Sequence, residues 1–515
     1  MFSSIMSGAV SGIDSYIVHV EVDIAVGMPS FDMVGFLGSE VKEARERVRT
    51  ALKNTGISMP PKRVTVNLAP ANIRKQGAAF DLPMAVAILC SLEAVQVVEV
   101  EHTLIVGELS LDGKVNAVYG VLPIVIGAKN AGCTRCIVPK ENAREGAAIK
   151  EIEVIGVDSL QETVDYLNGT GKLEPELFSW DGEVDCGHRE QDFADIEGQA
   201  GAKRGLEVAA AGFHNVLLIG PPGAGKTLLA RCIPTILPPM SVEESLEVSK
   251  VYSVSGLLKA GAPLVRTRPF VAPHHTVTDR ALTGGGAIPR PGGISLAHRG
   301  VLFLDELAEF KRSTLEILRQ PMEERAIHIA RSHGTYTYPA DFILVGAMNP
   351  CPCGHYPDLN HCTCKEHEIH RYMGRLSRPL LDRIDICMDV PRVEYQQLSK
   401  SMAKEVHANR EASADIRSRV IRARDIQTER YRGTSFRFNA DLGVGELRKY
   451  CFLGTKETAL LERAFEKMNL SARSYHRIIK VARTIADLDG TEKITERHLS
   501  EAIHYKSIDK KYERR

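Results

Sequence analysis

The sequence predicts a multidomain α/β protein, and three observations lead to that prediction. An apolar run at 215–219 precedes a glycine-rich segment at 220–227 and an apolar helix pattern at 228–233. A second apolar run at 301–304 ends in two acidic residues, and a third occupies 342–349. Short, continuously apolar runs are typical of strands buried on both faces of a parallel sheet. The C-terminal part lacks such runs and has the composition of helices.

Length and composition limit the classes of protein to consider. A chain of 515 residues is long enough for two to four domains. Lys plus Arg and Asp plus Glu both number 65, so any nucleic-acid surface must be local. No apolar run reaches the ~18–20 residues of a membrane span, and residues 1–5 lack the basic start of a signal peptide. Eleven cysteines in such a chain predict a cytoplasmic protein with free or metal-bound thiols.

Residues 1–168 predict a mixed α+β domain. Its expected elements are strands at 17–26, 63–70 and 136–139, helices at 39–54, 82–92 and 121–130, and a hairpin at 104–118 turning at Asp112-Gly113. Residues 169–190 are polar and rich in glycine, which predicts a linker. We expect a nucleotide-binding α/β core over 191–392 and a helical domain over 393–515.

The glycine-rich segment matches the phosphate-loop pattern GxxxxGK[ST], in the strand–turn–helix context that the pattern requires. Its residues are Gly220-Pro221-Pro222-Gly223-Ala224-Gly225-Lys226-Thr227. Glycines let backbone N–H groups surround phosphates, and the helix N-terminus adds partial positive charge. We expect Lys226 to reach the β- and γ-phosphates of ATP and Thr227 to hold Mg²⁺.

Two further strand ends supply polar groups. Asp305 and Glu306 follow the run at 301–304, which is the Walker B pattern. Asp305 is expected in the Mg²⁺ shell, and Glu306 is expected to orient and polarise the attacking water. Asn349 ends the third run, where it resembles the residue called sensor 1, which hydrogen-bonds the γ-phosphate or the water.

Four cysteines within fourteen residues form a C-x-C-x₈-C-x-C pattern that suits a tetrahedral structural zinc ion. They are Cys351, Cys353, Cys362 and Cys364. Four histidines are alternative ligands, and free thiols in a reducing compartment are the other interpretation. The histidines are His355, His361, His367 and His370.

The N-terminal residues 107–115 and 138–142 resemble the proteolytic domain of Lon-type proteases. That family uses a serine nucleophile and a lysine base. The matching positions here carry Ala79, in the stretch 75–80, and Leu122. Covalent catalysis needs both groups within hydrogen-bond reach, so we expect a Lon-like fold without proteolytic activity.

Segments of the core resemble AAA+ ATPases of the magnesium chelatase and MCM helicase branch. Residues 380–385 resemble an arginine-finger segment, which implies a ring in which Arg383 reaches a neighbouring subunit's nucleotide, with Arg378 as second choice. Residues 471–473 resemble sensor 2, which implies that Arg473 touches the γ-phosphate of its own subunit, with Arg477 as the fallback. Ile196 and Gly198 are the candidates beside the adenine.

Two inserts, 270–299 and 324–338, resemble the helix-2 insert and the pre-sensor-1 hairpin of the same branch. In helicases these elements line a pore and grip nucleic acid. Candidate donors are Arg280, Arg290, Arg299, Arg331 and His333, with solvated loop charge as the alternative. Helices are expected at 406–431, 455–469, 474–487 and 495–503; the arginines of the first face DNA or solvent.

The order of a Lon-like domain, a chelatase-type core and a helical lid resembles the YifB/ComM family of magnesium-chelatase-like ATPases. The resemblance implies a cytoplasmic homo-oligomer, a hexamer, that binds single-stranded or branched DNA and drives branch migration in natural transformation. The alternative is a magnesium-chelatase-type motor subunit that remodels a protein partner. The Lon-like domain and the lack of a DxSxS run argue against that alternative.

Overall fold

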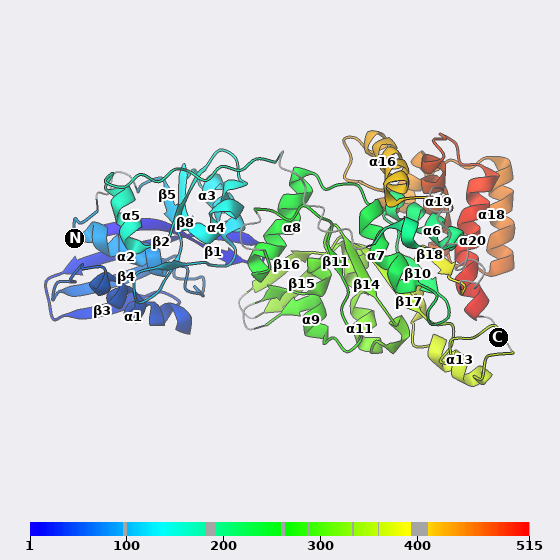
Figure 1. The fold of residues 1–515 in the computed structure, drawn as a ribbon, viewed down its shortest axis with the longest axis horizontal. Helices are drawn as coiled ribbons and strands as arrows, with labels where there is room; N and C mark the ends of the chain where they lie inside the picture. The colour runs from blue at the N-terminus through cyan, green and yellow to red at the C-terminus, as the bar shows by residue number, and fades with distance from the viewer. Residues whose placement is uncertain are drawn as a thin grey trace.

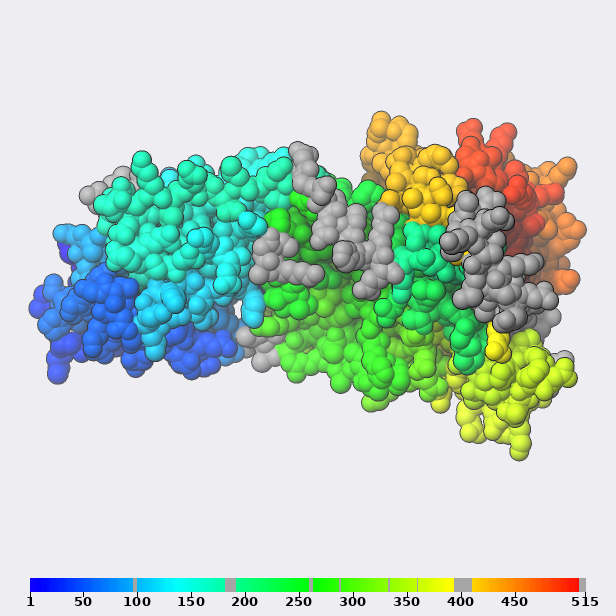
Figure 2. Space-filling model, viewed as in Figure 1, coloured from blue at the N-terminus to red at the C-terminus, as the bar shows by residue number. Residues whose placement is uncertain are grey.

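The structure is a computed structural model that describes residues 1–95, 100–180, 191–258, 263–286, 289–331, 334–358, 360–392 and 410–513. The chain is elongated, with an N-terminal α/β domain at one end, a parallel sheet in the middle and a group of helices at the other end (Figure 1). The space-filling view shows the N-terminal domain as a separate lobe beside the middle of the molecule (Figure 2). Among the described residues, no helix has the length and apolar character needed to cross a membrane.

A seven-stranded mixed sheet of order β3-β4-β2-β1-β5-β8-β9 forms the N-terminal domain. Strand β2 pairs antiparallel with β1 and with β4, and β3 pairs parallel with β4 at one edge of the sheet. On the other side of β1, strands β5, β8 and β9 follow in parallel. The strands are β1 (Phe2–Ser11), β2 (Asp14–Ala25), β3 (Ser30–Val34), β4 (Arg63–Ala69), β5 (Thr103–Ile105), β8 (Arg135–Pro139) and β9 (Glu153–Val157), with a separate short hairpin of β6 (Glu108–Leu109) and β7 (Val115–Asn116).

Helices cover both faces of this sheet, and α2 is buried on all sides whereas α1 and α5 bury one face. Helix α1 buries Val41, Ala44, Val48 and Leu52, which follow the three- and four-residue spacing of one helix face. Helices α1, α2 and α5 share one core with the sheet, and α3 and α4 share a second core. Their bounds are α1 (Ser39–Asn54), α2 (Asp81–Ser91), α3 (Val121–Asn130), α4 (Lys140–Ala147) and α5 (Leu160–Leu167).

The middle of the molecule is a five-stranded parallel sheet of order β11-β14-β17-β10-β18. Strands β10, β14 and β17 are buried at every position, as their continuous apolar runs predict. Alternate side chains pack into two cores, with Val216 and Leu218 on one side and Leu217 and Ile219 on the other. The strands are β10 (Val216–Ile219), β11 (Phe270–Val271), β14 (Val301–Leu304), β17 (Ile343–Met348) and β18 (Ile386–Asp389).

Helices and two small ribbons surround this sheet. The predicted hairpin is present as β15 (Ala326–Arg331) and β16 (Gly334–Pro339), and its tip, 332–333, lies outside the described residues. The second ribbon pairs β12 (Gly284–Gly285) with β13 (Arg290–Pro291). The helices are α6 (Ala200–Gly212), α7 (Lys226–Ile236), α8 (Val242–Ser255), α9 (Asp279–Thr283), α10 (Gly293–Leu296), α11 (Arg312–Ile317), α12 (Arg319–Glu324), α13 (Glu366–Met373) and α14 (Arg378–Leu381).

The C-terminal helices share a core with one face of the parallel sheet. They are α16 (Ser413–Arg430), α17 (Val444–Tyr450), α18 (Thr455–Met468), α19 (Ala472–Leu488) and α20 (Glu496–Glu513). The helix predicted over 406–431 begins only at Ser413, because 410–412 are described and not helical; 393–409 lie outside the described residues.

Several arginines of α16 are structural, which bears on the two interpretations that the sequence left open. Arg424 donates to the Ala210 carbonyl and lies 3.8 Å from the centroid of the Phe438 ring. Arg430 donates to Asp487 at 2.8 Å, and Arg419 pairs with Glu207 of α6. These contacts fasten α16 to the rest of the chain.

The N-terminal half adds two features that the sequence prediction left out. The sequence does not predict the strands β1 and β3, because β1 mixes serine and glycine with its apolar residues and β3 is short. Residues 169–180 of the predicted linker lie against the N-terminal domain: the Glu176 amide donates to the Val154 carbonyl, and Trp180 packs against a core of that domain. The rest of the predicted linker, 181–190, lies outside the described residues.

Candidate nucleotide-binding site and cysteine cluster

The candidate site lies at one edge of the parallel sheet. Strands β10, β14 and β17 run in the same direction, so their carboxyl ends meet at that edge. The phosphate-loop segment follows β10, Asp305 follows β14 and Asn349 follows β17. Three segments that are far apart in sequence are thereby brought together, as ligand sites at the carboxyl ends of α/β sheets require.

Glycine is needed at two positions of the phosphate loop. Gly225 is the N-cap of α7 and has φ of +87°, a left-handed conformation that favours glycine. A Cβ atom at Gly220 would lie 2.1 Å from the Val390 carbonyl oxygen, because the loop crosses the end of β18. The loop therefore ends with the N-terminus of α7 directed at the position where phosphates bind in such loops.

The ammonium group of Lys226 links the loop to the end of β17. Its Nζ donates to the carbonyl oxygens of Gly220 at 2.7 Å and Pro221 at 2.9 Å, and to Asn349 Oδ1 at 3.1 Å. Burial lowers the pKa of Lys226, while Asp305 and Glu306 oppose that shift. A buried cation of this kind is a strong partner for phosphate oxygens.

Asp305 and Thr227 are in contact across the sheet edge. Thr227 Oγ1 donates to Asp305 Oδ2 at 2.8 Å. A hydroxyl and a carboxylate held this close offer the oxygen ligands that Mg²⁺ prefers. The chemistry of these donors fits Mg²⁺ bound together with a nucleotide.

Glu306 is held in a conformation that few residues other than glycine adopt. Its φ is +50°, and its backbone N–H donates to Asp305 Oδ1 at 2.9 Å. Such backbone outliers gather at functional sites. The Glu306 carboxylate lies 3.5 Å from His275 Nδ1, and the His275 ring lies 4.1 Å from that of His274. Sequence reasoning treated residues 270–299 only as an insert and missed the contact of His275 with Glu306.

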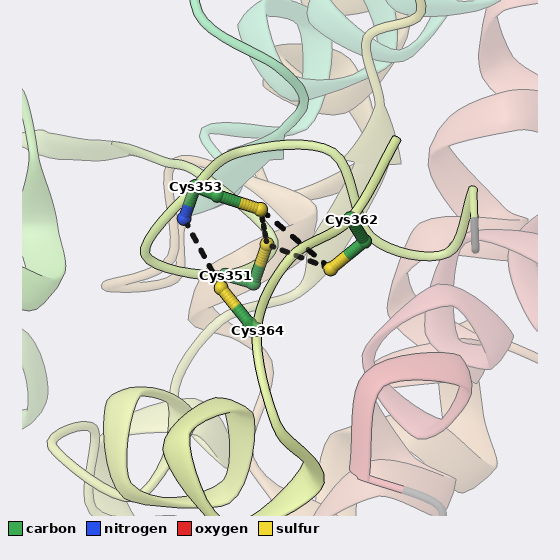
Figure 3. A group of neighbouring side chains, drawn as sticks. All are labelled: Cys351, Cys353, Cys362 and Cys364. Atoms are coloured by element: carbon green, nitrogen blue, oxygen red, sulfur yellow. Dashed lines mark hydrogen bonds between the residues drawn. The ribbon is translucent and has the colours of Figure 1, made fainter. Parts of the chain in front are cut away.

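The four cysteines lie together immediately after β17, with their sulfur atoms turned toward one another (Figure 3). Cys351 Sγ lies 3.4 Å from Cys353 Sγ and 3.8 Å from Cys362 Sγ, and all four sulfurs lie within 4.8 Å of one another. Four sulfurs around a tetrahedral ion with bonds of about 2.3 Å would be about 3.8 Å apart. In the described part of the chain, the histidines are not part of this group. The cluster is therefore able to hold a metal ion.

The cysteine loop packs against the phosphate loop. A Cβ atom on Gly354, whose φ is +83°, would lie 2.3 Å from Pro222 Cδ. The loop also begins two residues after Asn349. The position of this loop is thus coupled to that of the nucleotide site.

Three family models match the chain in consecutive segments. Residues 20–142 match "Subunit ChlI of Mg-chelatase", residues 192–398 match "Magnesium chelatase, subunit ChlI", and residues 410–506 match its C-terminal model. An "Uncharacterized protein YifB" of Escherichia coli is 42% identical over 510 residues, covering 99% of this chain and 97% of the relative. "Competence protein ComM" of Haemophilus influenzae is 41% identical over 506 residues, covering 98% and 97%.

The chain belongs to the YifB/ComM family of magnesium-chelatase-like proteins. The middle sheet is therefore an AAA+ α/β core, and the family implies that it binds ATP and Mg²⁺ and hydrolyses ATP. A "Magnesium-chelatase 67 kDa subunit" of Chlorobaculum parvum is 28% identical over 162 residues, 31% of this chain and 23% of that subunit. Because the model matching 20–142 also carries the chelatase name, the N-terminal domain alone is no argument against a chelatase-type subunit.

The sequence predicts that Arg383 reaches the nucleotide of a neighbouring subunit and that Arg473 reaches the nucleotide of its own subunit. In the structure both arginines lie beside one carboxylate, that of Glu323. Arg383 is 4% exposed, donates to the Pro379 carbonyl at 2.6 Å and pairs with Glu323 of α12. Arg473 is exposed, and its guanidinium lies 3.9 Å from the same Glu323. Arg383 and Arg473 therefore lie near one another in the same subunit.

The alternative arginines differ in their surroundings. The Arg477 side chain is held in place: it donates to the Arg383 carbonyl at 2.8 Å and pairs with Asp385. Burial alone would raise the pKa of Asp385, but the nearby Arg477 and His214 keep that pKa below its usual range. Arg378 is exposed at the start of α14. Arg477 is therefore structural, and Arg378 remains available.

The candidate nucleic-acid donors in the inserts are not equivalent. Arg299 is a correction to the sequence prediction: it is 6% exposed, pairs with Asp341, and lies 2.8 Å from Glu247. Arg280, Arg290 and Arg331 are exposed. His333 lies outside the described residues.

The two positions matched to the Lon dyad are apolar in their setting as well. Leu122 is fully buried in a core of the N-terminal domain, and Ala79 packs against the same core.

Of the two residues predicted to lie beside the adenine, Ile196 is buried. Gly198 precedes Gln199, whose side-chain amide donates to the Pro391 carbonyl at 2.6 Å.

Proposed function

We propose that this protein is an ATP-driven ring motor that acts on DNA, a branch-migration helicase of recombination or natural transformation. The observation that carries the ATPase part is the meeting of Lys226, Thr227, Asp305 and Asn349 at one sheet edge. Lys226 and the loop N–H groups bind the phosphates, and Thr227 with Asp305 holds Mg²⁺. Glu306 orients the water, and Asn349 contacts the γ-phosphate or that water.

Support for DNA as the substrate comes from exposed cations on the inserts and from the name of a relative. Arg280, Arg290 and Arg331 are exposed on elements that line the pore in similar helicases. The Haemophilus relative is named a competence protein. Arg383 and Arg473 support a ring, since both face Glu323 and neither contacts the phosphate loop of its own subunit among the described residues.

The domains take separate roles in this proposal. Residues 1–168 form a Lon-like, non-proteolytic domain, 191–392 the AAA+ core and 393–515 the lid, in a cytoplasmic hexamer. The cysteine cluster holds a structural zinc ion, because four thiolates at this spacing suit zinc.

The test is the ATPase rate of the full chain alone, with single-stranded DNA and with a four-way junction. Stimulation by DNA, greatest with the junction, is the expected result. A rate that no DNA changes, together with stimulation by a porphyrin-binding protein partner, would favour the chelatase-type motor instead. Casein digestion is expected to be absent.

A further inference from the structure

A cavity of about 940 Å³ lies where the N-terminal domain meets the inserts of the AAA+ core. One wall comes from the N-terminal domain and includes Arg74 and the loop 76–80, which holds Ala79. The opposite wall comes from the second ribbon, at Arg290, and from the hairpin, at Arg331 and Tyr336. The cavity therefore joins the region that resembles the Lon active site to the elements proposed to grip DNA.

The contact between the two walls is built from specific interactions. The Gly120 amide donates to the Ser253 carbonyl of α8 at 3.1 Å. The Arg266 guanidinium lies 5.0 Å from the centroid of the Trp180 ring. The cavity is lined by two domains that are packed together, so a ligand that fills it contacts both.

Three arginines of the lining have no carboxylate partner in the described part of the chain. Arg74 lies over the Phe36 ring at 5.9 Å, and Arg290 lies over the Tyr119 ring at 5.3 Å. Arg331 donates only to the backbone oxygens of Gly286 and Ala330. These three guanidiniums are available for an anionic ligand.

The acidic groups of the lining are engaged within the N-terminal domain. Glu40 accepts from the Gly77 amide at 3.0 Å, and Glu108 accepts from Asn116 at 3.4 Å. Glu43 lies 4.0 Å from Arg47, the fourth arginine of the lining, which itself donates to the buried Asp81. Two of the three arginines without a carboxylate partner, Arg74 and Arg290, instead lie over aromatic rings.

Aromatic side chains accompany those arginines on both walls. Tyr16 and Phe36 come from the N-terminal domain, Tyr336 from the hairpin, and Tyr119 from the domain boundary. Phe36 and Tyr119 are 44% and 62% exposed, so their rings are accessible at the cavity. Aromatic platforms next to available arginines are the combination that binds single-stranded nucleic acid, because bases stack while guanidiniums meet phosphates.

We propose that this cavity binds a segment of single-stranded nucleic acid, which passes between the N-terminal domain and the hairpin. Arg74, Arg290 and Arg331 contact phosphates, and Tyr16, Tyr119 and Tyr336 stack on bases. The proposal rests on the proposed DNA motor function and gives the N-terminal domain a part in it. The cavity contains no lysine, histidine or cysteine among its described lining residues, which suits binding better than covalent chemistry.

The experiment measures binding of a fluorescent thymidine oligomer of about 30 nucleotides to the full chain, by anisotropy, with Mg²⁺ and a non-hydrolysable ATP analogue. Arg74→Glu is expected to weaken binding by about tenfold or more. It is also expected to reduce the slope of log Kd against log salt by about 0.7 for each phosphate that the variant no longer neutralises. Tyr336→Ala is expected to weaken binding on the order of tenfold with the salt slope unchanged.

Arg49→Glu is the matched control, because Arg49 is also an exposed arginine of the same domain. It lies nine residues from Glu40 on α1, about two and a half turns away, on the opposite face of that helix. Binding equal to that of the wild type is expected for this variant. Photo-crosslinking of a thiothymidine oligomer to wild-type protein, followed by peptide mapping, gives a readout that needs no variant. Crosslinks are expected at Tyr16, Tyr119 or Tyr336.

The outcomes separate the two proposals. DNA binding by the wild type, with Arg74→Glu no weaker than Arg49→Glu and no crosslinks within 1–168, overturns the cavity proposal and leaves the motor proposal intact. An absence of any DNA binding or DNA-stimulated ATPase activity overturns both. Displacement of the oligomer by an unfolded polypeptide that crosslinks to the same tyrosines would assign the cavity to peptide and overturn it as a nucleic-acid site.

Discussion

The edge of the parallel sheet and the cavity beside the N-terminal domain differ in the chemical character of the residues in their loops. At the sheet edge, each of three strands is followed by residues with polar groups, and Lys226, Asp305 and Asn349 come together. In the N-terminal domain, the positions matched to the Lon dyad carry Ala79, which lines the cavity, and Leu122, which is buried in a core, and both are apolar. The parallel-sheet domain therefore holds residues suited to a reaction, whereas the N-terminal domain lines a cavity suited to binding alone.

The largest effect is expected at the sheet edge. Lys226→Ala should abolish nucleotide binding, because it removes the cation that compensates the phosphates. Equilibrium dialysis with labelled ATP measures this. Lys311→Ala, an exposed lysine at the start of α11, is the control and should bind normally.

Glu306 should affect turnover rather than binding. Glu306→Gln should still bind ATP yet hydrolyse it slowly, because the attacking water loses the group that orients it. Glu309→Gln, three residues away and exposed, should hydrolyse ATP at the wild-type rate. Steady-state phosphate release measures both variants, and equal turnover in all three proteins would remove Glu306 from the site.

The next largest effect concerns the arginines beside Glu323. Arg383→Ala is expected to slow hydrolysis on the order of 10³-fold with nucleotide binding intact, if Arg383 acts as a finger. The same should hold for Arg473→Ala, because the two groups share Glu323. Mixing either variant with Lys226→Ala should restore part of the ATPase rate, since an intact pocket then faces an intact arginine. Recovery with Arg383→Ala but not with Arg473→Ala would return Arg473 to its own subunit's site, and normal turnover by Arg383→Ala alone would make Arg378 the candidate.

The cysteine cluster should affect both stability and the nucleotide site. Cys353→Ser with Cys362→Ser is expected to lose bound zinc and to lower the midpoint of thermal unfolding. Because Gly354 packs against Pro222, the same variant should also bind ATP more weakly. Metal analysis, thermal unfolding and ATP titration measure the three effects. The control is His355→Ala with His361→Ala, which should retain the metal; wild-type protein with well under one zinc per chain would refute the site.

The smallest effect is a pH dependence at the boundary of the two domains. Burial raises the pKa of Glu145 to about 7, and Ser253 and the hydrogen bond from Asn142 offset part of that rise. Between its ordinary value of 4.5 and about 7 the folded chain keeps this proton and the unfolded chain releases it. The free energy of unfolding therefore falls as pH rises through this range.

Glu145→Gln removes this titration, so its unfolding temperature should exceed that of the wild type by a margin that grows from about pH 5 to about pH 8. Glu141→Gln, an exposed glutamate on the same helix, should show no such trend. A margin independent of pH would mean that Glu145 is charged in the folded chain.

The sequence by itself determined the features that depend on local periodicity and on residues close in the chain. The helix predicted at 39–54 is α1 to the residue, and strands lie within the runs at 215–219, 301–304 and 342–349, because apolar spacing and strand-end residues are local signals. The cysteines were grouped correctly for the same reason, since fourteen residues can close only a small loop.

Only the tertiary structure decided which charged groups are available. Arg299 was grouped with Arg290 and Arg331 from the sequence, yet Arg299 is buried against Asp341 and the other two are exposed. Burial depends on partners such as Asp341, which are dozens of residues away and leave no local pattern. The contact of His275 with Glu306 and the cavity between the domains have the same origin: they arise where separate elements pack together.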